Sequence, residues 1–108
     1  MTTPDQARAI FLTMPVVEEE QLTGHMGYRL NTKMFGTLWP AVSFATLRVG
    51  KEEQTMLLAD ALIFSIPQTG VKGGWVSVKL AAIDQEDFRA LVWKAWHNTA
   101  PPRLSLQY

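Results

Sequence analysis

Few side chains in this sequence belong to the types that carry out nucleophilic, acid–base or metal chemistry. The 108 residues contain no cysteine, and His25 and His97 are the two histidines. Two histidines are too few for a catalytic triad or a closed metal site unless carboxylates complete the set. His25 follows the acidic run Glu18 to Glu20, but like charges in a row are typical of a solvated surface. We therefore predict no catalytic residue, no metal site and no cofactor, and we expect a protein that binds without catalysis.

Aromatic and basic side chains offer binding chemistry instead. Trp39 and Trp75 fall beside loops or at outward-facing strand positions, so we predict that they line a ligand groove. Aromatic rings beside cations also suit nucleic acid, because bases stack on the rings while phosphates attract the cations. The alternative is that these tryptophans fill gaps at the rim of the core. The cations predicted to lie near these rings are Arg29, Lys33, Lys72 and Lys79.

The overall charge argues against tight binding of nucleic acid. Ten basic and ten acidic side chains cancel, whereas a domain that neutralises many phosphates ordinarily carries a basic surplus. The charges are unevenly distributed along the chain. Between residues 24 and 83 six bases face three acids, and in residues 1–23 one base faces four acids. The middle of the chain is therefore the part best suited to meet an anion.

Composition predicts a single soluble domain covering residues 1–108. The chain is 47% apolar and 19% charged, which is enough to bury one core. The N-terminal stretch shows no cationic leader followed by a long apolar run, and no window approaches the roughly 20 apolar residues of a membrane span. We therefore expect a cytoplasmic protein that does not enter the membrane.

Both ends of the sequence have helical periodicity. Thr3 is a candidate N-cap, with Pro4 in the first helical position and Gln6 placed to complete a capping box. Asp84 is the candidate cap of a second helix, which should end near Asn98 because two prolines follow. The stripes predicted to face the core are Ala7, Ile10, Phe11 and Met14 in the first helix and Phe88, Leu91, Val92, Ala95 and Trp96 in the last.

The segment between these helices alternates apolar and polar residues, which is typical of half-buried strands. The pattern predicts strands at residues 26–30, 33–38, 42–49, 62–66 and 75–80, with a short helix at 51–59. A shift in phase near Ala45 and Thr46 predicts a bulge in the third strand. The tail after residue 102 alternates too, so it either lies along the sheet or stays loose.

Two terminal helices with one apolar stripe each, around an antiparallel sheet, predict an α+β two-layer sandwich. Both helices would pack on one face of a bent sheet, because each has a single stripe to bury. The opposite face would then lack a covering layer. We expect any binding function on that open face.

The order of these segments resembles the MmcQ/YjbR family of small bacterial proteins over residues 7–102. The resemblance is carried by residues 11–15 with the glutamates that follow, and by residues 27–30, 33–38, 47–49, 73–80 and 95–101. It implies a frataxin-like (CyaY-like) fold and a predicted double-wing DNA-binding function. The bases that would contact phosphate in such a wing are Arg29, Lys33, Arg48, Lys51, Lys72 and Lys79, of which Arg29 and Lys33 match the family's pattern.

Two functional hypotheses follow from the sequence. The first is weak DNA binding through the basic middle segment. The second is binding of a small molecule or a protein partner on the open sheet face, with Trp39 and Trp75 in the groove. An enzyme is the third and least favoured alternative, because no catalytic grouping is visible.

Overall fold

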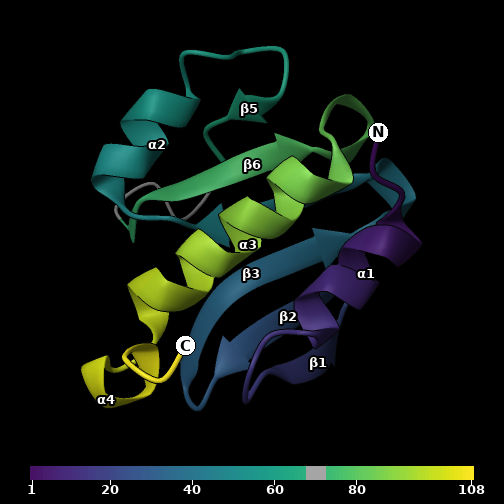
Figure 1. Cartoon of the computed structure of the whole chain (residues 1–108). Helices are drawn as coiled ribbons and strands as arrows, with labels where there is room; N and C mark the ends of the chain where they lie inside the picture. The colour runs from purple at the N-terminus through teal and green to yellow at the C-terminus, as the bar shows by residue number, and fades with distance from the viewer. Residues whose placement is uncertain (68–72) are drawn as a thin grey trace.

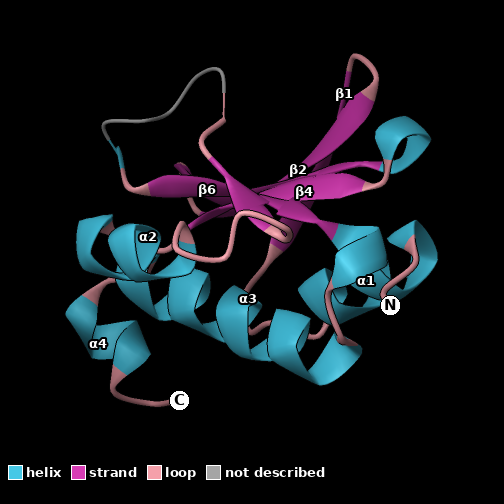
Figure 2. Cartoon of the chain, turned by 90° about the horizontal axis from the view of Figure 1, so that it is seen from above, coloured by secondary structure: helices cyan, strands magenta, loops and turns pink. Residues whose placement is uncertain are grey.

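The fold is an antiparallel sheet with helices on one side. A computed structural model describes residues 1–67 and 73–108, and within these residues six strands form one sheet. The helices lie together beneath the sheet in Figure 2, and helices from the two ends of the chain lie side by side in Figure 1. The predicted α+β two-layer arrangement is therefore confirmed, and among the described residues no α-helix covers the other sheet face.

Every predicted helix and strand is present, largely at its predicted position, and one further strand and one further helix occur. The strands are β1 (Glu18–Leu22), β2 (His25–Leu30), β3 (Lys33–Trp39), β4 (Phe44–Arg48), β5 (Phe64–Ser65) and β6 (Trp75–Lys79), in the spatial order β1-β2-β3-β4-β6-β5. The helices are α1 (Pro4–Leu12), α2 (Lys51–Leu57), α3 (Gln85–Thr99) and α4 (Pro102–Ser105), with short 3-10 turns at Pro40–Val42 and Leu80–Ala82.

Helix α1 begins at a complete capping box. The Thr3 side chain accepts a hydrogen bond from the Gln6 backbone, and the Gln6 side chain accepts one from the Thr3 N–H. The cap fixes the direction of the helix, so that Phe11 is fully buried and stacks on Tyr28 of β2 with 4.1 Å between ring centroids. Gly36 of β3 makes room for the Phe11 ring, because an added Cβ there would lie 2.5 Å from Phe11 Cε1.

Helix α3 supplies the rest of the core. Asp84 caps it through the Glu86 N–H, and every residue of its predicted stripe is buried. Trp96 is fully buried, and its Nε1–H donates to the Pro15 carbonyl at 2.9 Å, which joins α3 to the end of α1. The two terminal helices thus form one continuous layer.

Glu19 joins the edge of the sheet to the helical layer. Both of its carboxylate oxygens accept hydrogen bonds from Arg8 of α1 at 2.9 Å, and one also accepts the Tyr28 hydroxyl at 2.8 Å. Hydrogen bonds from Arg8 and, to a smaller degree, from Tyr28 lower the pKa of Glu19 against the opposing effect of desolvation. Burial raises the pKa of Tyr28, and the Glu19 carboxylate adds to the rise. The acidic run, which the sequence indicated to be a solvated surface, begins the edge strand β1, and its middle residue anchors that strand to the helical layer.

Three local predictions were wrong. The bulge is not at Ala45 and Thr46, since β4 pairs without interruption on both sides; the register instead shifts between β2 and β3, where Phe35 is the extra residue. The apparent shift in phase arises because Val42 belongs to a 3-10 turn and the apolar residue Phe44 is on the same face as Thr46, away from the buried Ala45 and Leu47. Strand β5 is shorter than predicted, and the tail, predicted either to lie along the sheet or to stay loose, forms α4.

Candidate functional site

The open face of the sheet carries the side chains that the alternation turns away from the core. In β6, Val76 and Val78 are buried on the helix-covered face, while Trp75 and Ser77 point to the other side. The same alternation in β3 and β4 presents Thr37, Trp39 and Thr46 on the open face. The site is thus built on strands, whose positions are fixed by the ladder of hydrogen bonds.

The strand register arranges these side chains in rows across the sheet. Trp39 pairs with Phe44, and Phe44 pairs with Lys79, which makes one row at the end of the sheet. From β2 to β5 the neighbouring row contains only small or hydroxyl-bearing residues, namely Gly27, Thr37, Thr46, Ser77 and Ser65, and Glu20 of β1 pairs with Gly27 at its end. Beyond it Arg29 pairs with Met34, and Arg48 pairs with Trp75. A floor of hydroxyls therefore lies between two rows that carry tryptophan.

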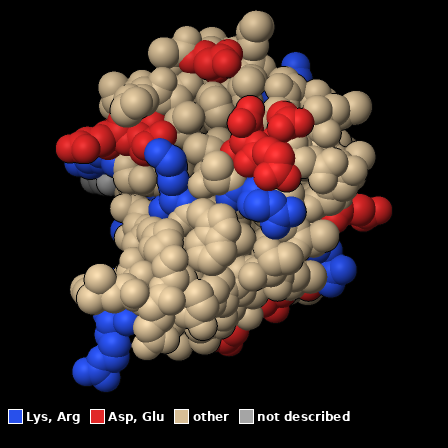
Figure 3. Space-filling model, viewed as in Figure 1, with Lys and Arg blue, Asp and Glu red and all other residues tan. Residues whose placement is uncertain are grey.

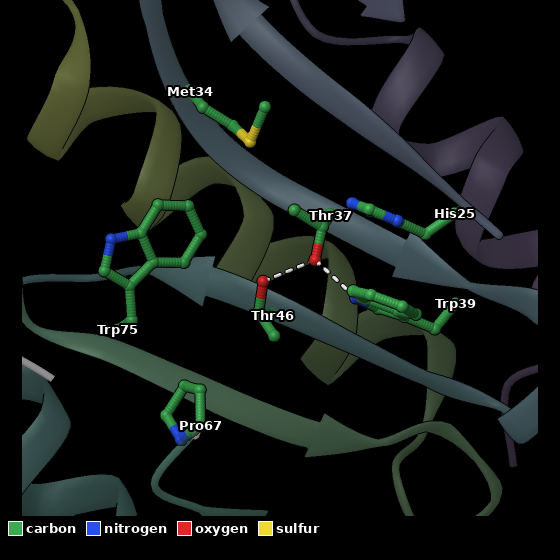
Figure 4. Close-up of a pocket in the computed structure, with 7 residues that line it drawn as sticks. All are labelled: His25, Met34, Thr37, Trp39, Thr46, Pro67 and Trp75. Carbon is green, nitrogen blue, oxygen red and sulfur yellow. Dashed lines mark hydrogen bonds between the residues drawn. The ribbon is translucent and has the colours of Figure 1, made fainter. Parts of the chain in front are cut away.

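A hollow of about 300 Å³ lies over this floor. Figure 4 shows Trp39 stacked on His25 at one side, Trp75 at the other, and the Thr37 and Thr46 side chains between them. The residues that line it are His25, Met34, Thr37, Trp39, Thr46, Pro67 and Trp75. We call this hollow the open-face groove. It brings together the two tryptophans that the sequence singled out, 36 positions apart in the chain.

The wall formed by Trp39 is rigidly held. Its ring lies parallel to the His25 ring, with 3.8 Å between centroids, and Phe44 lies 5.7 Å away on the adjacent strand. Its Nε1–H donates to Thr37 Oγ1 at 3.0 Å, and His25 Nδ1 lies 3.0 Å from the Thr23 carbonyl. Fixed aromatic walls bind flat ligands at a low cost in conformational entropy.

The threonine pair at the floor of the groove has one hydroxyl proton that is not used in a hydrogen bond within the pair. Thr37 Oγ1 and Thr46 Oγ1 are 2.5 Å apart and share one hydrogen bond, and Thr37 already accepts from Trp39. Each hydroxyl carries one proton, and the hydrogen bond between the two oxygens uses one of these two protons. Whichever threonine donates, the other retains an O–H that has no acceptor among residues 1–67 and 73–108. The groove therefore offers one hydrogen-bond donor to a ligand.

A second hollow of about 560 Å³ continues the groove toward β5. It shares Trp39, Thr46 and Pro67 with the first, and Phe44, Ser65, Ile66 and Ser77 complete its lining. The open face is thus hollowed along most of the hydroxyl row, and a ligand longer than one ring system would fit along it.

The predicted phosphate contacts do not lie in one patch. Arg29 is on the open face and forms an ion pair with Glu20 of β1. Arg48 is at the end of β4, whereas Lys79 ends β6 at the opposite end of that strand pair. Lys33 begins β3, and Lys51 is the first residue of α2, the short helix predicted at residues 51–59. Lys72 lies outside the described residues.

Charges on the helix-covered side are scattered as well. Figure 3 shows acidic and basic side chains there in small separate groups among uncharged surface. In the described residues, Lys94 of α3 pairs with Glu53 of α2 at 3.0 Å, so some of this charge is neutralised locally. Among these residues no group of three or more His, Asp or Glu side chains is placed to hold a metal ion. No helix of the described chain is long and apolar enough to cross a membrane.

Four groove residues were missed by sequence reasoning: Met34, Thr37, Thr46 and Pro67. His25 was considered only as a metal ligand beside the glutamates, and it stacks on Trp39 instead. The alternation of β3 and β4 puts Thr37 on the same face as Trp39, so this signal was present in the sequence. The pairing of Thr37 with Thr46 required the register between the strands.

The fold and the groove define a class of protein: a small α+β domain with one helix-covered sheet face and one open, hollowed face. The chain belongs to the YjbR family, whose model matches residues 12–98. It is also similar in fold to the crystal structure of Deinococcus radiodurans protein DR2400, described as a DUF419 domain, with a TM-score of 0.75. That similarity has 18% sequence identity and covers 90% of this chain and 78% of the other. Among curated proteins no match is found.

Proposed function

We propose that this protein binds a small, flat organic ligand in the open-face groove and does so without catalysis. The observation that supports the proposal is the groove itself: two indoles, from β3 and β6, border a pair of threonine hydroxyls that retains a free O–H. Apolar walls with a few placed polar groups are typical of small-molecule sites, and a hollow of about 300 Å³ is at the lower end of their usual size.

The proposal favours one of the two hypotheses from the sequence over the other. DNA binding would need bases gathered on one surface, whereas Arg48 and Lys79 lie at opposite ends of the β4–β6 pair and Lys51 begins helix α2. Another candidate, Arg29, is already paired with Glu20. The DNA hypothesis predicts that duplex DNA binds at about 50 mM salt and that this binding weakens steeply as the salt concentration rises. The groove hypothesis predicts no binding of duplex DNA at about 50 mM salt. A gel-shift experiment at that salt separates the two.

Indole N–H resonances give a direct test of the groove. The chain has four tryptophans, two at the groove and two, Trp93 and Trp96, on α3. We expect a flat probe, 2-naphthamide or 2-naphthoate, to shift the Trp39 and Trp75 signals in a proton–nitrogen NMR spectrum and to leave those of α3 unchanged. Movement of the α3 signals alone, or of none, would contradict the proposal.

Substitutions at two half-buried tryptophans provide the matched control. Trp75→Ala should weaken probe binding by roughly tenfold, because stacking on one ring is worth about 1–3 kcal/mol. Trp93→Ala removes a ring of similar exposure from the helix-covered side and should leave the affinity unchanged. Equal affinities of the two variants would place the ligand somewhere other than the groove.

A further inference from the structure

Arg48 differs from the other arginine of the open face. Arg29 has an acidic partner, Glu20, on the neighbouring strand. Among the described residues Arg48 forms no ion pair, and its Nε–H is buried without a hydrogen-bond acceptor. A buried donor left without a partner costs about 1–3 kcal/mol, and more when it belongs to a charged group. An anion from outside the described chain would therefore stabilise the Arg48 guanidinium.

The backbone holds Arg48 firmly at the end of β4. Its carbonyl accepts a hydrogen bond from Asn98 Nδ2 of α3 at 3.0 Å. The N–H groups of the next two residues, Val49 and Gly50, both donate to the Gly74 carbonyl. These bonds attach the strand end to α3 on one side and to the start of β6 on the other. The backbone that carries the Arg48 side chain is therefore held in place by both neighbours.

Arg48 also lies beside the Trp75 wall of the groove. The two residues are paired across β4 and β6. A Cβ added at Gly73 would lie 2.9 Å from Trp75 Cδ1 and 3.5 Å from Arg48 Nε, so the indole and the guanidinium share this neighbour. Arg48 does not line the groove itself, but it is the cross-strand neighbour of Trp75, which does.

We propose that the ligand of the open-face groove is an aromatic anion, with its ring between Trp39 and Trp75 and its carboxylate or phosphate arm on Arg48. The inference rests on the proposed function of the groove. Guanidinium binds either anion through paired, charge-assisted hydrogen bonds, which are about twice as strong as neutral ones. A ring acceptor on such a ligand would take the spare O–H of the threonine pair.

Two probes of the same shape test the role of charge. 2-Naphthoate is an anion at neutral pH, and 2-naphthamide is its uncharged counterpart with the same ring system. Calorimetry on the wild-type protein should give an affinity about tenfold higher for the naphthoate, because one charge-assisted interaction is added. This preference should shrink as salt increases.

Arginine variants show which cation is responsible. Arg48→Gln should abolish the preference for naphthoate while leaving the affinity for naphthamide unchanged, and Arg48→Lys should keep part of it. Arg29→Gln is the matched control, since Arg29 is on the same face but paired, and it should keep the full preference. Thermal unfolding of each variant checks that it is folded, and Arg48→Lys retains the test if Arg48→Gln is not.

The outcomes separate the two proposals. If both probes bind the wild-type protein equally, the inference about charge is overturned and the groove function stands. If the preference survives Arg48→Gln or is lost in Arg29→Gln, the assignment to Arg48 is overturned. If neither probe binds, the proposed function fails, and the inference that rests on it fails too.

Discussion

The two faces of the sheet are made from the same strands but carry different kinds of side chain. The helix-covered face is filled with large side chains in direct contact, such as Phe11, Tyr28 and Trp96, all fully buried. The open face carries short hydroxyl residues down its middle, with aromatic side chains at the sides. Alternation within a strand thus places the core on one face and the proposed binding groove on the other, so that changes on one face should affect the other little.

The sharpest test of this separation is a deletion in the core. Phe11→Ala removes a fully buried ring that stacks on Tyr28 and packs against Phe35 and Phe88. We expect a loss of about 3–5 kcal/mol in the free energy of unfolding, measured by urea denaturation. Trp75→Ala on the open face should cost about 1 kcal/mol or less. Similar losses of stability in the two variants would contradict the difference proposed between the two faces.

A smaller effect is expected at the polar anchor of the covered side. Tyr28→Phe keeps the ring stack and removes only the hydrogen bond to the Glu19 carboxylate. Since hydrogen bonds to charged groups contribute about 1.5–3 kcal/mol, we expect a loss near the lower end of that range, because Arg8 still holds Glu19. Tyr108→Phe, in the exposed tail, is the control and should not alter the unfolding midpoint.

The same anchor predicts how stability depends on pH. The pKa of Glu19 is lowered in the folded protein, so its contribution is present above the unfolded value of about 4.3 and is lost as the pH falls through the folded value. Glu19→Gln should flatten the loss of thermal stability below about pH 4.3, and Arg8→Gln should flatten it partly. A slope identical to that of the wild-type protein in both variants would show that Glu19 is not the group responsible.

The smallest effect on stability is expected at the floor of the groove. Thr46→Val keeps the shape of the side chain and removes the hydroxyl paired with Thr37. We expect a change within about 1 kcal/mol in stability. Probe affinity should drop a few fold, because the Thr37 hydroxyl is then the one member of the pair left to donate a hydrogen bond to the probe. Ser105→Ala is the control, because it removes a hydroxyl at the end of α4 that does not line the groove, and it should leave probe affinity unchanged. A large loss of stability in Thr46→Val would mean that the open face also holds the fold together.

Much of the fold could be predicted because its signals are local. The capping box at Thr3 and the cap at Asp84 depend on residues two or three positions away, and the helical stripes depend on spacing within one element. The errors came where local pattern and long-range pairing compete. Phe35 looks like an ordinary strand residue, and only its pairing with β2 makes it a bulge. The tail has an alternating pattern too short to outweigh the turn that its two prolines start.

The sequence by itself determined which residues face inward and outward, since each strand's alternation and each helix's stripe are properties of neighbouring residues. It thereby put Trp39 and Trp75 on the outer surface. The tertiary structure alone decided that Trp39 stacks on His25, that Thr37 meets Thr46, and that Arg48 lies beside Trp75. The physical reason is register: side chains on different strands become neighbours only when the backbone hydrogen bonds align those strands, and no single segment of the chain contains that information.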